Sequence, residues 1–165
     1  DNEIKQRFLT AYNELMDSRD AVLADCDLIR QTLCDTTQLD AEMQREHDEM
    51  MVASELMKAH IKKNASVAQS QDAYALEAGR IEERYNTAFE QYTALEAERD
   101  KRVRKSKELI TFIAMLKKQP LVVTEWNERL WITLLDTATV QRDGSIMFRF
   151  KSGAEITAKQ KTVEL

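Results

Sequence analysis

Hydrophobic positions recur every three or four residues along most of this chain. Over residues 3–34 one stripe follows that spacing, with Arg19 as its one polar interruption. The stripe consists of Phe8, Tyr12, Leu15, Val22, Cys26, Ile29 and Leu33. Because this spacing places side chains on one face of an α-helix, the pattern predicts a long first helix that ends near residues 35–36.

Two further stripes predict a second and a third helix. Thr37 followed by Asp40 has the form of a capping box, so we expect the second helix to start there and to run from about Leu39 to Asn64. Its seam is Leu39, Met43, Met50, Ala53, Met57 and either His60 or Ile61, interrupted by Glu46. The third helix is expected over residues 71–118, with a seam of Tyr74, Ala78, Ile81, Tyr85, Ala88, Tyr92, Leu95, Leu109, Ile113 and Leu116. A period near 3.5 residues kept over so many turns is typical of a coiled coil.

The link between these two helices leaves two arrangements open. The stripe stays in phase from Met43 to Leu95, so one continuous helix is compatible with it. In that case Asn64 and Gln71 would occupy core positions, where polar side chains weaken a coiled coil. Residues 64–72 also supply capping side chains for two helix ends. We therefore predict an antiparallel coiled-coil hairpin with its tip near residues 65–69.

The period changes after Pro120, which ends the third helix. Thr124 can cap a short helix that carries Trp126, Leu130, Trp131, Leu134 and Leu135. Residues 137–141 alternate, Asp143-Gly144 favours a hairpin, and Ile146, Phe148 and Phe150 then face one side of a sheet. A turn at Ser152-Gly153 precedes a third strand over residues 154–158.

The predicted fold is therefore mainly α, in three parts. Residues 1–36 form the preceding long helix, residues 37–118 the antiparallel coiled-coil hairpin, and residues 119–165 a small C-terminal helix plus β-meander. Because so small a sheet buries little surface, we expect the ends of the first and third helices to pack on it.

Charge is distributed unevenly along the chain. Charged residues make up 32% of the sequence, with three Gly and one Pro, as long solvated helices require. The net charge is −5, but residues 99–118 contain eight Lys or Arg against two Asp or Glu. A basic zone on an acidic body can dock a polyanion locally.

Catalytic and metal chemistry find little support in the sequence. No Gly-rich phosphate loop is present, and no nucleophile has a base at a fixed spacing, so no catalytic residue is predicted. Cys26, Cys34, His47 and His60 lack the close pairing of a zinc site, and we expect them in core or surface roles. Two cysteines eight residues apart on one helix lie about 12 Å apart, too far for a disulfide. Reduced thiols and the lack of an apolar run of about 18 residues indicate a cytoplasmic protein without a membrane span.

Several segments occur in a distinctive order. They are the tip at residues 64–71, Phe112-Ile113, Leu116-Lys117-Lys118-Gln119-Pro120, residues 125–131, and the strand pair with its turns at residues 143–153. In this order and spacing the chain resembles the C-terminal part of large serine recombinases, the site-specific integrases of bacterial mobile elements and prophages. The resemblance covers most of the chain and is strongest over residues 60–158.

The resemblance implies a DNA recombination function. In that family an N-terminal domain carries the nucleophilic serine, a recombinase domain and a zinc ribbon bind the attachment site, and a coiled coil contacts other subunits and controls the direction of recombination. This chain lacks the catalytic domain and the zinc ligands, so both are expected upstream of Asp1, with no cofactor in the chain itself. The implied partners are attachment-site DNA, other recombinase subunits and a directionality factor, with no membrane.

The resemblance also assigns candidate residues. Subunit contact is expected at the coiled-coil tip through Ala65, Val67 and Ala68. DNA contact is expected through Lys101, Arg102, Arg104, Lys105, Arg142, Arg149 and Lys151. Two alternatives stay open: the basic run is a solvated helix face, and the chain is a generic coiled-coil interaction module with no role in recombination. The methionines of the second helix likewise have two interpretations. They either pack within the coiled coil or line an adaptable docking groove.

Overall fold

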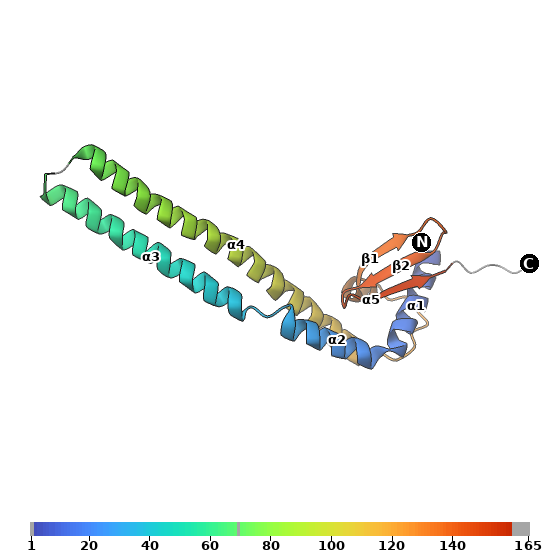
Figure 1. Cartoon of the computed structure of the whole chain (residues 1–165). Coiled ribbons are helices and arrows are strands. Elements are labelled where there is room, and N and C mark those ends of the chain that lie inside the picture. The colour runs from blue at the N-terminus through green and yellow to red at the C-terminus, as the bar shows by residue number, and fades with distance from the viewer. Residues whose placement is uncertain (1, 69, 160–165) are drawn as a thin grey trace, which may run out of the picture. The chain divides into compact units, whose positions relative to one another are not determined.

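The computed structural model describes residues 2–68 and 70–159. Helices dominate, and a small antiparallel sheet follows them, which confirms the predicted fold class (Figure 1). In chain order the elements are α1 (Asn2–Asp17), α2 (Arg19–Thr32), α3 (Thr37–Ser66), α4 (Gln71–Lys118), α5 (Glu128–Leu134), β1 (Leu135–Val140), β2 (Ile146–Phe150) and β3 (Glu155–Ala158). The contacts divide the chain into two units. We call Asp35–Val103 the hairpin unit, and the described residues of Asp1–Cys34 with Arg104–Leu165 the sheet unit.

In the hairpin unit, α3 and the first part of α4 lie side by side and run in opposite directions (Figure 1). The helix stops at Ser66 and the next residue, Val67, is extended at φ −135° and ψ 129°. Ser70 directly precedes α4, and its hydroxyl accepts a hydrogen bond from the Ala73 amide at 3.4 Å. The chain thus reverses between Ser66 and Gln71, as the capping residues predicted, and the continuous-helix alternative is wrong. Gln69, within the predicted tip, lies outside the described residues.

The start of α3 is placed correctly by the sequence, but its cap is not the predicted one. The N-cap is Thr36, whose hydroxyl donates to the Asp40 carboxylate at 2.9 Å. The Asp35 carboxylate accepts from the Thr37 amide at 3.1 Å. Asp35 therefore satisfies one backbone amide, and Asp40 lies in the first turn, where negative charge is favoured by the helix dipole.

The seam of the hairpin unit is narrow. Leu39, Ala53, Ile81 and Ala88 are buried, and most other predicted seam residues are half-buried. The sequence left either His60 or Ile61 as the last α3 residue of the seam. His60 is half-buried and Ile61 is 52% exposed, so the seam residue is His60. Much of each helix surface faces solvent, as the charged composition predicts.

In the sheet unit, the predicted single helix over residues 3–34 is two helices. The break is at Ser18, just before Arg19, the polar interruption of the stripe. The Ser18 hydroxyl donates to the Leu15 carbonyl at 3.2 Å, a local side-chain bond that competes with helix continuation. The predicted end of the first helix is also wrong, because α2 ends at Thr32. Leu33 is therefore 71% exposed, whereas Cys34 is buried.

The C-terminal elements follow the prediction with shifted boundaries. The cap of α5 is Asn127, not Thr124, because the Asn127 side chain accepts from the Arg129 and Leu130 amides at 2.9 and 3.4 Å. The sheet has the order β1-β2-β3 with both pairs antiparallel. The first loop closes through the Gln141 amide and the Ser145 carbonyl at 2.8 Å, and Gly144 takes the left-handed conformation there at φ 78°.

One aromatic core joins the helices to the sheet. The inner face of β2 buries Ile146, Phe148 and Phe150, as predicted. Phe8 of α1 lies at the centre, with ring centroids 5.1–6.3 Å from those of Tyr12, Trp126, Trp131, Phe148 and Phe150. Leu109, Phe112 and Leu116 of α4 belong to the same core. The ends of the first and third predicted helices therefore do pack on the sheet.

Candidate functional site

The residues predicted to contact DNA fall in both units. Lys101 and Arg102 belong to the hairpin unit. The sheet unit holds the others, which are Arg104, Lys105, Arg142, Arg149 and Lys151.

Within the sheet unit, Lys105 lies beside the backbone of Lys151. The Lys105 ammonium of α4 donates to the Lys151 carbonyl at 2.8 Å, and the Lys151 ammonium donates to the Ile132 carbonyl at 3.0 Å. A charge from the basic run therefore lies next to the turn that ends β2. The two residues are 46 positions apart, so periodicity alone could not predict this pairing. We call Lys105 and Lys151 the basic pair.

The other cations of the sheet unit are more scattered. Arg149 faces outward from β2, as predicted, but its guanidinium pairs with Glu155 of β3 at 2.6 and 2.8 Å. Arg142 is exposed in the loop before β2, whereas Lys151 follows β2, so the strand separates them by about 15 Å. Arg104 is exposed on α4. Arg142 and Arg104 are thus exposed to a polyanion, whereas the charge on Arg149 is offset by Glu155.

Arg102 has a structural partner that the sequence did not indicate. Its guanidinium donates to the Asp35 carbonyl at 2.8 Å and to the Glu98 carboxylate at 3.1 Å. It therefore ties α4 to the segment that leads into α3. Lys101, next to it, is exposed.

Ion pairs across the hairpin join its two helices. The Arg84 guanidinium of α4 makes two hydrogen bonds to the Glu49 carboxylate of α3, one of them at 2.9 Å. Arg99 pairs with Asp40 through one hydrogen bond nearer the start of α3. Hydrogen bonds from these arginines lower the pKa of the Glu49 and Asp40 carboxyls below their ordinary values. Both carboxylates therefore stay charged at neutral pH.

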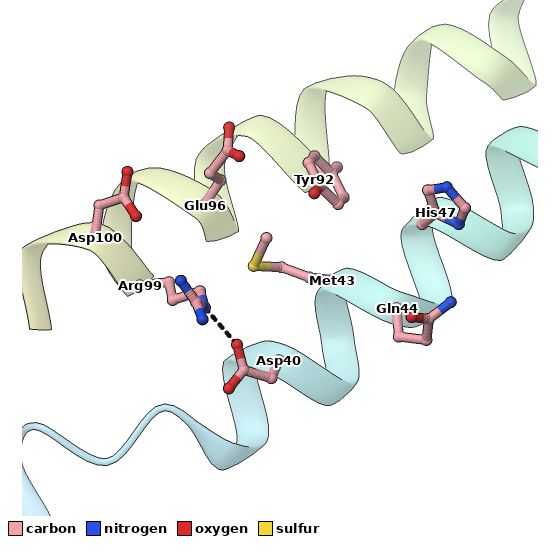
Figure 2. Close-up of a pocket in the computed structure, with 8 residues that line it drawn as sticks. All are labelled: Asp40, Met43, Gln44, His47, Tyr92, Glu96, Arg99 and Asp100. Carbon is pink, nitrogen blue, oxygen red and sulfur yellow. Dashed lines mark hydrogen bonds and ion pairs between the residues drawn. The ribbon is translucent and has the colours of Figure 1, made fainter. Parts of the chain in front are cut away.

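A groove lies between α3 and α4 beside the second of these pairs. Figure 2 shows its lining: Asp40, Met43, Gln44, His47, Tyr92, Glu96, Arg99 and Asp100. Its volume is about 460 Å³ and it opens to solvent. The Arg99 guanidinium points at Asp40, while Glu96 and Asp100 project from α4 (Figure 2). Among the described residues no group of three acidic, histidine or cysteine side chains could hold a metal ion. The groove thus offers polar contacts.

The predicted tip residues are accessible. Ala65, Val67 and Ala68 are exposed, with Val67 at 55%. Two apolar side chains close to them in sequence, Ile61 and Leu76, are 52% and 61% exposed. Exposed large apolar groups on both helix ends give the tip a surface that another protein can bury. The seam analysis missed Leu76 because it lies off the heptad stripe.

Both cysteines lie in the core. Cys26 and Cys34 are free and buried. Burial, with smaller contributions from Asp25 and Asp27, raises the pKa of the Cys26 thiol to about 11. A thiol in that state is a poor nucleophile and a poor metal ligand.

In the part of the chain that the structure describes, no helix combines the length and the apolar character that crossing a bilayer would require. A scan against protein-family models finds no match for this chain, and searches of curated proteins and of solved structures find none either.

Proposed function

We propose that this chain is the coiled-coil portion of a DNA site-specific recombinase of the large serine type. In this proposal the hairpin unit contacts other recombinase subunits during synapsis and controls the direction of recombination. The β-meander supports binding to the attachment site. The observation that carries the proposal is the order of elements. An antiparallel helical hairpin, in which α3 ends at Ser66 and α4 begins at Gln71, is followed by α5 and a meander with its turn at Asp143 and Gly144.

The DNA-binding half of the proposal is supported by charge placement. The basic pair and the exposed Arg142 put cations on a small sheet in a chain whose net charge is −5. Cations near phosphates release condensed counterions, and this makes binding depend on salt. The proposal therefore concerns phosphate contact, since no base-reading geometry is assigned.

The subunit-contact half is supported by the tip. Its exposed Val67 and Ile61 lie at the end of a helical pair about 45 Å long, given the 30 residues of α3. A hairpin of this length keeps an interaction surface far from its own start. That separation suits a contact between subunits bound to different DNA segments.

The upstream reading frame gives the first test. The proposal expects a zinc ribbon directly upstream of Asp1 and a resolvase-like catalytic domain with a nucleophilic serine before it. An upstream region that encodes neither would refute the recombinase assignment and leave the generic coiled-coil module.

Fluorescence anisotropy with a labelled 30-base-pair duplex tests the DNA-binding half. We expect the affinity of the chain to fall with salt, with a log–log slope near −0.9 for each phosphate contact. The triple variant Arg142→Ala, Arg149→Ala, Lys151→Ala should flatten that slope by about two to three contacts. The matched control, Lys58→Ala, Lys62→Ala, Lys63→Ala, removes three cations from α3 and should leave the slope unchanged. Equal effects of both triples would exclude a specific role for the β-meander.

A tip variant in the parent protein tests the subunit-contact half. Val67→Asp should abolish the joining of two attachment-site DNAs, measured by gel shift of the synaptic complex, while single-site binding persists. Val52→Asp is the matched control, because Val52 is 46% exposed on the middle of α3. Synapsis that survives Val67→Asp, or that is lost equally in both variants, would contradict a role for the tip.

A further inference from the structure

A pocket lies in the sheet unit between the last turns of α4 and α5. Its volume is about 340 Å³, and its lining includes Lys118, Gln119, Asn127 and Arg129. The first two belong to the segment 116–120 and the other two to residues 125–131, which are two of the segments that carry the sequence resemblance. None of the four is among the predicted DNA contacts, so the proposed function leaves this pocket without a role.

Packing and hydrogen bonds hold the walls of the pocket in place. Leu116 of α4 and Leu130 of α5 are 0% and 2% exposed and belong to the same buried core. The segment between these helices is tied to α1 by Asn13. Its side chain donates to the Val123 carbonyl at 3.1 Å and accepts from the Val123 amide at 2.9 Å. The pocket is therefore formed before any ligand binds, which lowers the entropic cost of binding.

Lys118 and Arg129 are the charged side chains of the lining. Both are exposed, and neither makes an ion pair with a residue that the structure describes. Glu125 and Glu128 are close in sequence, but neither lines the pocket. A guanidinium can donate two parallel hydrogen bonds to a phosphate, and an ammonium adds a point charge. The charges of the pocket therefore suit a phosphate group.

Two side-chain amides add neutral donors to these charges. The Gln119 amide nitrogen donates to the Met115 sulfur at 3.2 Å, and a thioether is a weak acceptor that a phosphate oxygen can replace. The Asn127 side-chain oxygen accepts from the Arg129 and Leu130 amides. Its side-chain nitrogen has no hydrogen bond to another described residue and remains a donor. A phosphate in the pocket would therefore have donors of both kinds.

The pocket lies at one end of an exposed stripe on α4. Residues 104, 107, 111, 114 and 118 follow the three-and-four spacing of one helix face, and all five are exposed. Three of them are cations, Arg104, Lys107 and Lys118, and they extend over about 21 Å at 1.5 Å per residue. Glu108, the one acidic residue in this part of α4, pairs with Lys105 at 3.7 Å. A row of like charges of this length favours a polyanion over a single small anion.

We propose that this pocket binds a phosphate group of a DNA backbone, and that the DNA then continues along the stripe toward Arg104. Lys118 and Arg129 supply the charge, and the Gln119 and Asn127 amides donate to the phosphate oxygens. The choice of DNA as the polyanion rests on the proposed function, whereas the choice of phosphate rests on the lining of the pocket.

Fluorescence anisotropy of the whole 165-residue chain with the labelled 30-base-pair duplex tests the pocket. Lys118→Gln with Arg129→Gln should weaken binding by roughly tenfold or more, because charge-assisted hydrogen bonds are lost. The magnitude of the log–log salt slope should fall by about 0.9, the value for one phosphate contact. The matched control, Lys62→Gln with Lys117→Gln, removes two exposed cations outside the pocket and the stripe and should change neither quantity. Circular dichroism melts check that both double variants are folded.

Side-chain amide resonances identify the source of the phosphate. In a ¹⁵N-labelled chain, the Gln119 and Asn127 side-chain signals should shift with substoichiometric duplex, and with inorganic phosphate only at far higher concentration. Gln38 on α3, which donates to Glu42 at 2.8 Å, serves as the control and should not shift. Shifts with inorganic phosphate and none with the duplex would overturn DNA as the ligand, together with the DNA-binding half of the proposed function.

Other outcomes would overturn the pocket alone. A duplex affinity and salt slope that the pocket variant leaves unchanged would do so, and DNA binding through the β-meander would still stand. Equal losses in the pocket variant and its control would exclude a localised site. Polyglutamate that shifts the two amides at the same concentration as the duplex would assign the pocket to carboxylates instead of phosphates.

Discussion

Removing the ring of Phe8 should destabilise the sheet unit more than any other single truncation of a phenylalanine. Phe8 is 0% exposed, and its ring contacts those of five other aromatic residues. Those are Tyr12, Trp126, Trp131, Phe148 and Phe150. Burial of a phenylalanine removes about 200 Å² of apolar surface from water, worth about 5 kcal/mol as an upper value. Measured Phe→Ala substitutions in cores cost about 3–5 kcal/mol. We therefore expect Phe8→Ala to lower the free energy of unfolding by about 4 kcal/mol.

Urea unfolding followed by tryptophan fluorescence measures this loss directly. Both tryptophans, Trp126 and Trp131, lie within 5.6 Å of the Phe8 ring by centroid, so their emission reports on this core. A loss of about 4 kcal/mol is a large share of the 5–15 kcal/mol typical of a folded domain. The midpoint should fall strongly while the slope of the transition stays the same.

Phe89→Ala is the matched control for Phe8→Ala. It deletes the same atoms from α4 at a site that is 51% exposed, so its cost should stay within about 0.5 kcal/mol. Equal losses in the two variants, or a loss below about 1 kcal/mol for Phe8→Ala, would refute the reasoning that burial in the aromatic core sets the cost.

Three further outcomes are expected. The hydrogen bond from Arg84 lowers the pKa of Glu49 below its ordinary value of 4.5, so this pair stabilises the fold above that pH and the benefit is lost as the pH falls through the lowered pKa. In thermal melts, the Glu49→Gln variant should therefore lose less stability than the wild type as the pH falls from 5 to 2. Identical pH profiles of the two proteins would argue against a stabilising Glu49–Arg84 ion pair. The Cys26 thiol, with its pKa raised to about 11, should resist iodoacetamide at pH 8 until urea unfolds the chain, as followed by mass spectrometry. Gly79→Ala should raise stability by up to about 1 kcal/mol, because Gly79 lies inside α4 with open space around it. Gly153→Ala should lower stability instead, since Gly153 has a φ of 91°, and equal effects in the two melts would argue against this backbone account.

The helical stripes could be predicted because heptad spacing is a local property of the chain. The bounds of α4, Gln71–Lys118, match the expected residues 71–118, since capping residues at one end and Pro120 beyond the other mark them. The break at Ser18 was missed because the stripe continues in phase through it, and only a side-chain bond to the Leu15 carbonyl reveals it. The cap at Asn127 was missed because Thr124 is also a capping residue by type.

The candidate site was harder to predict than the fold. Residue type and position gave the list of cations, but charge neutralisation depends on neighbours that are distant in sequence. Arg149 meets Glu155 across two strands, and Arg102 meets the Asp35 carbonyl 67 positions away. The Lys105–Lys151 contact depends on how α4 packs on the sheet. The Lys105 ammonium likewise lies 3.7 Å from the Glu108 carboxylate. The proposed DNA contacts of Arg149, Arg102 and Lys105 are therefore weaker candidates than those of Lys151 and Arg142.

The polar pairs of the hairpin unit explain how a narrow seam can hold one register. Four predicted seam residues are buried, and two of them are the alanines Ala53 and Ala88, so apolar burial alone discriminates poorly between registers. A slip of one heptad would carry Glu49 about 10.5 Å along the axis from Arg84, and Asp40 equally far from Arg99. Exposed ion pairs add little stability. These two pairs nevertheless lie at different positions along the helix axis, and both can form together in one register only. The His60 ring, stacked on Tyr74 at 4.5 Å, adds a third match near the tip. The charges thus fix where the tip lies along the arm, as the proposed contact with a second subunit requires.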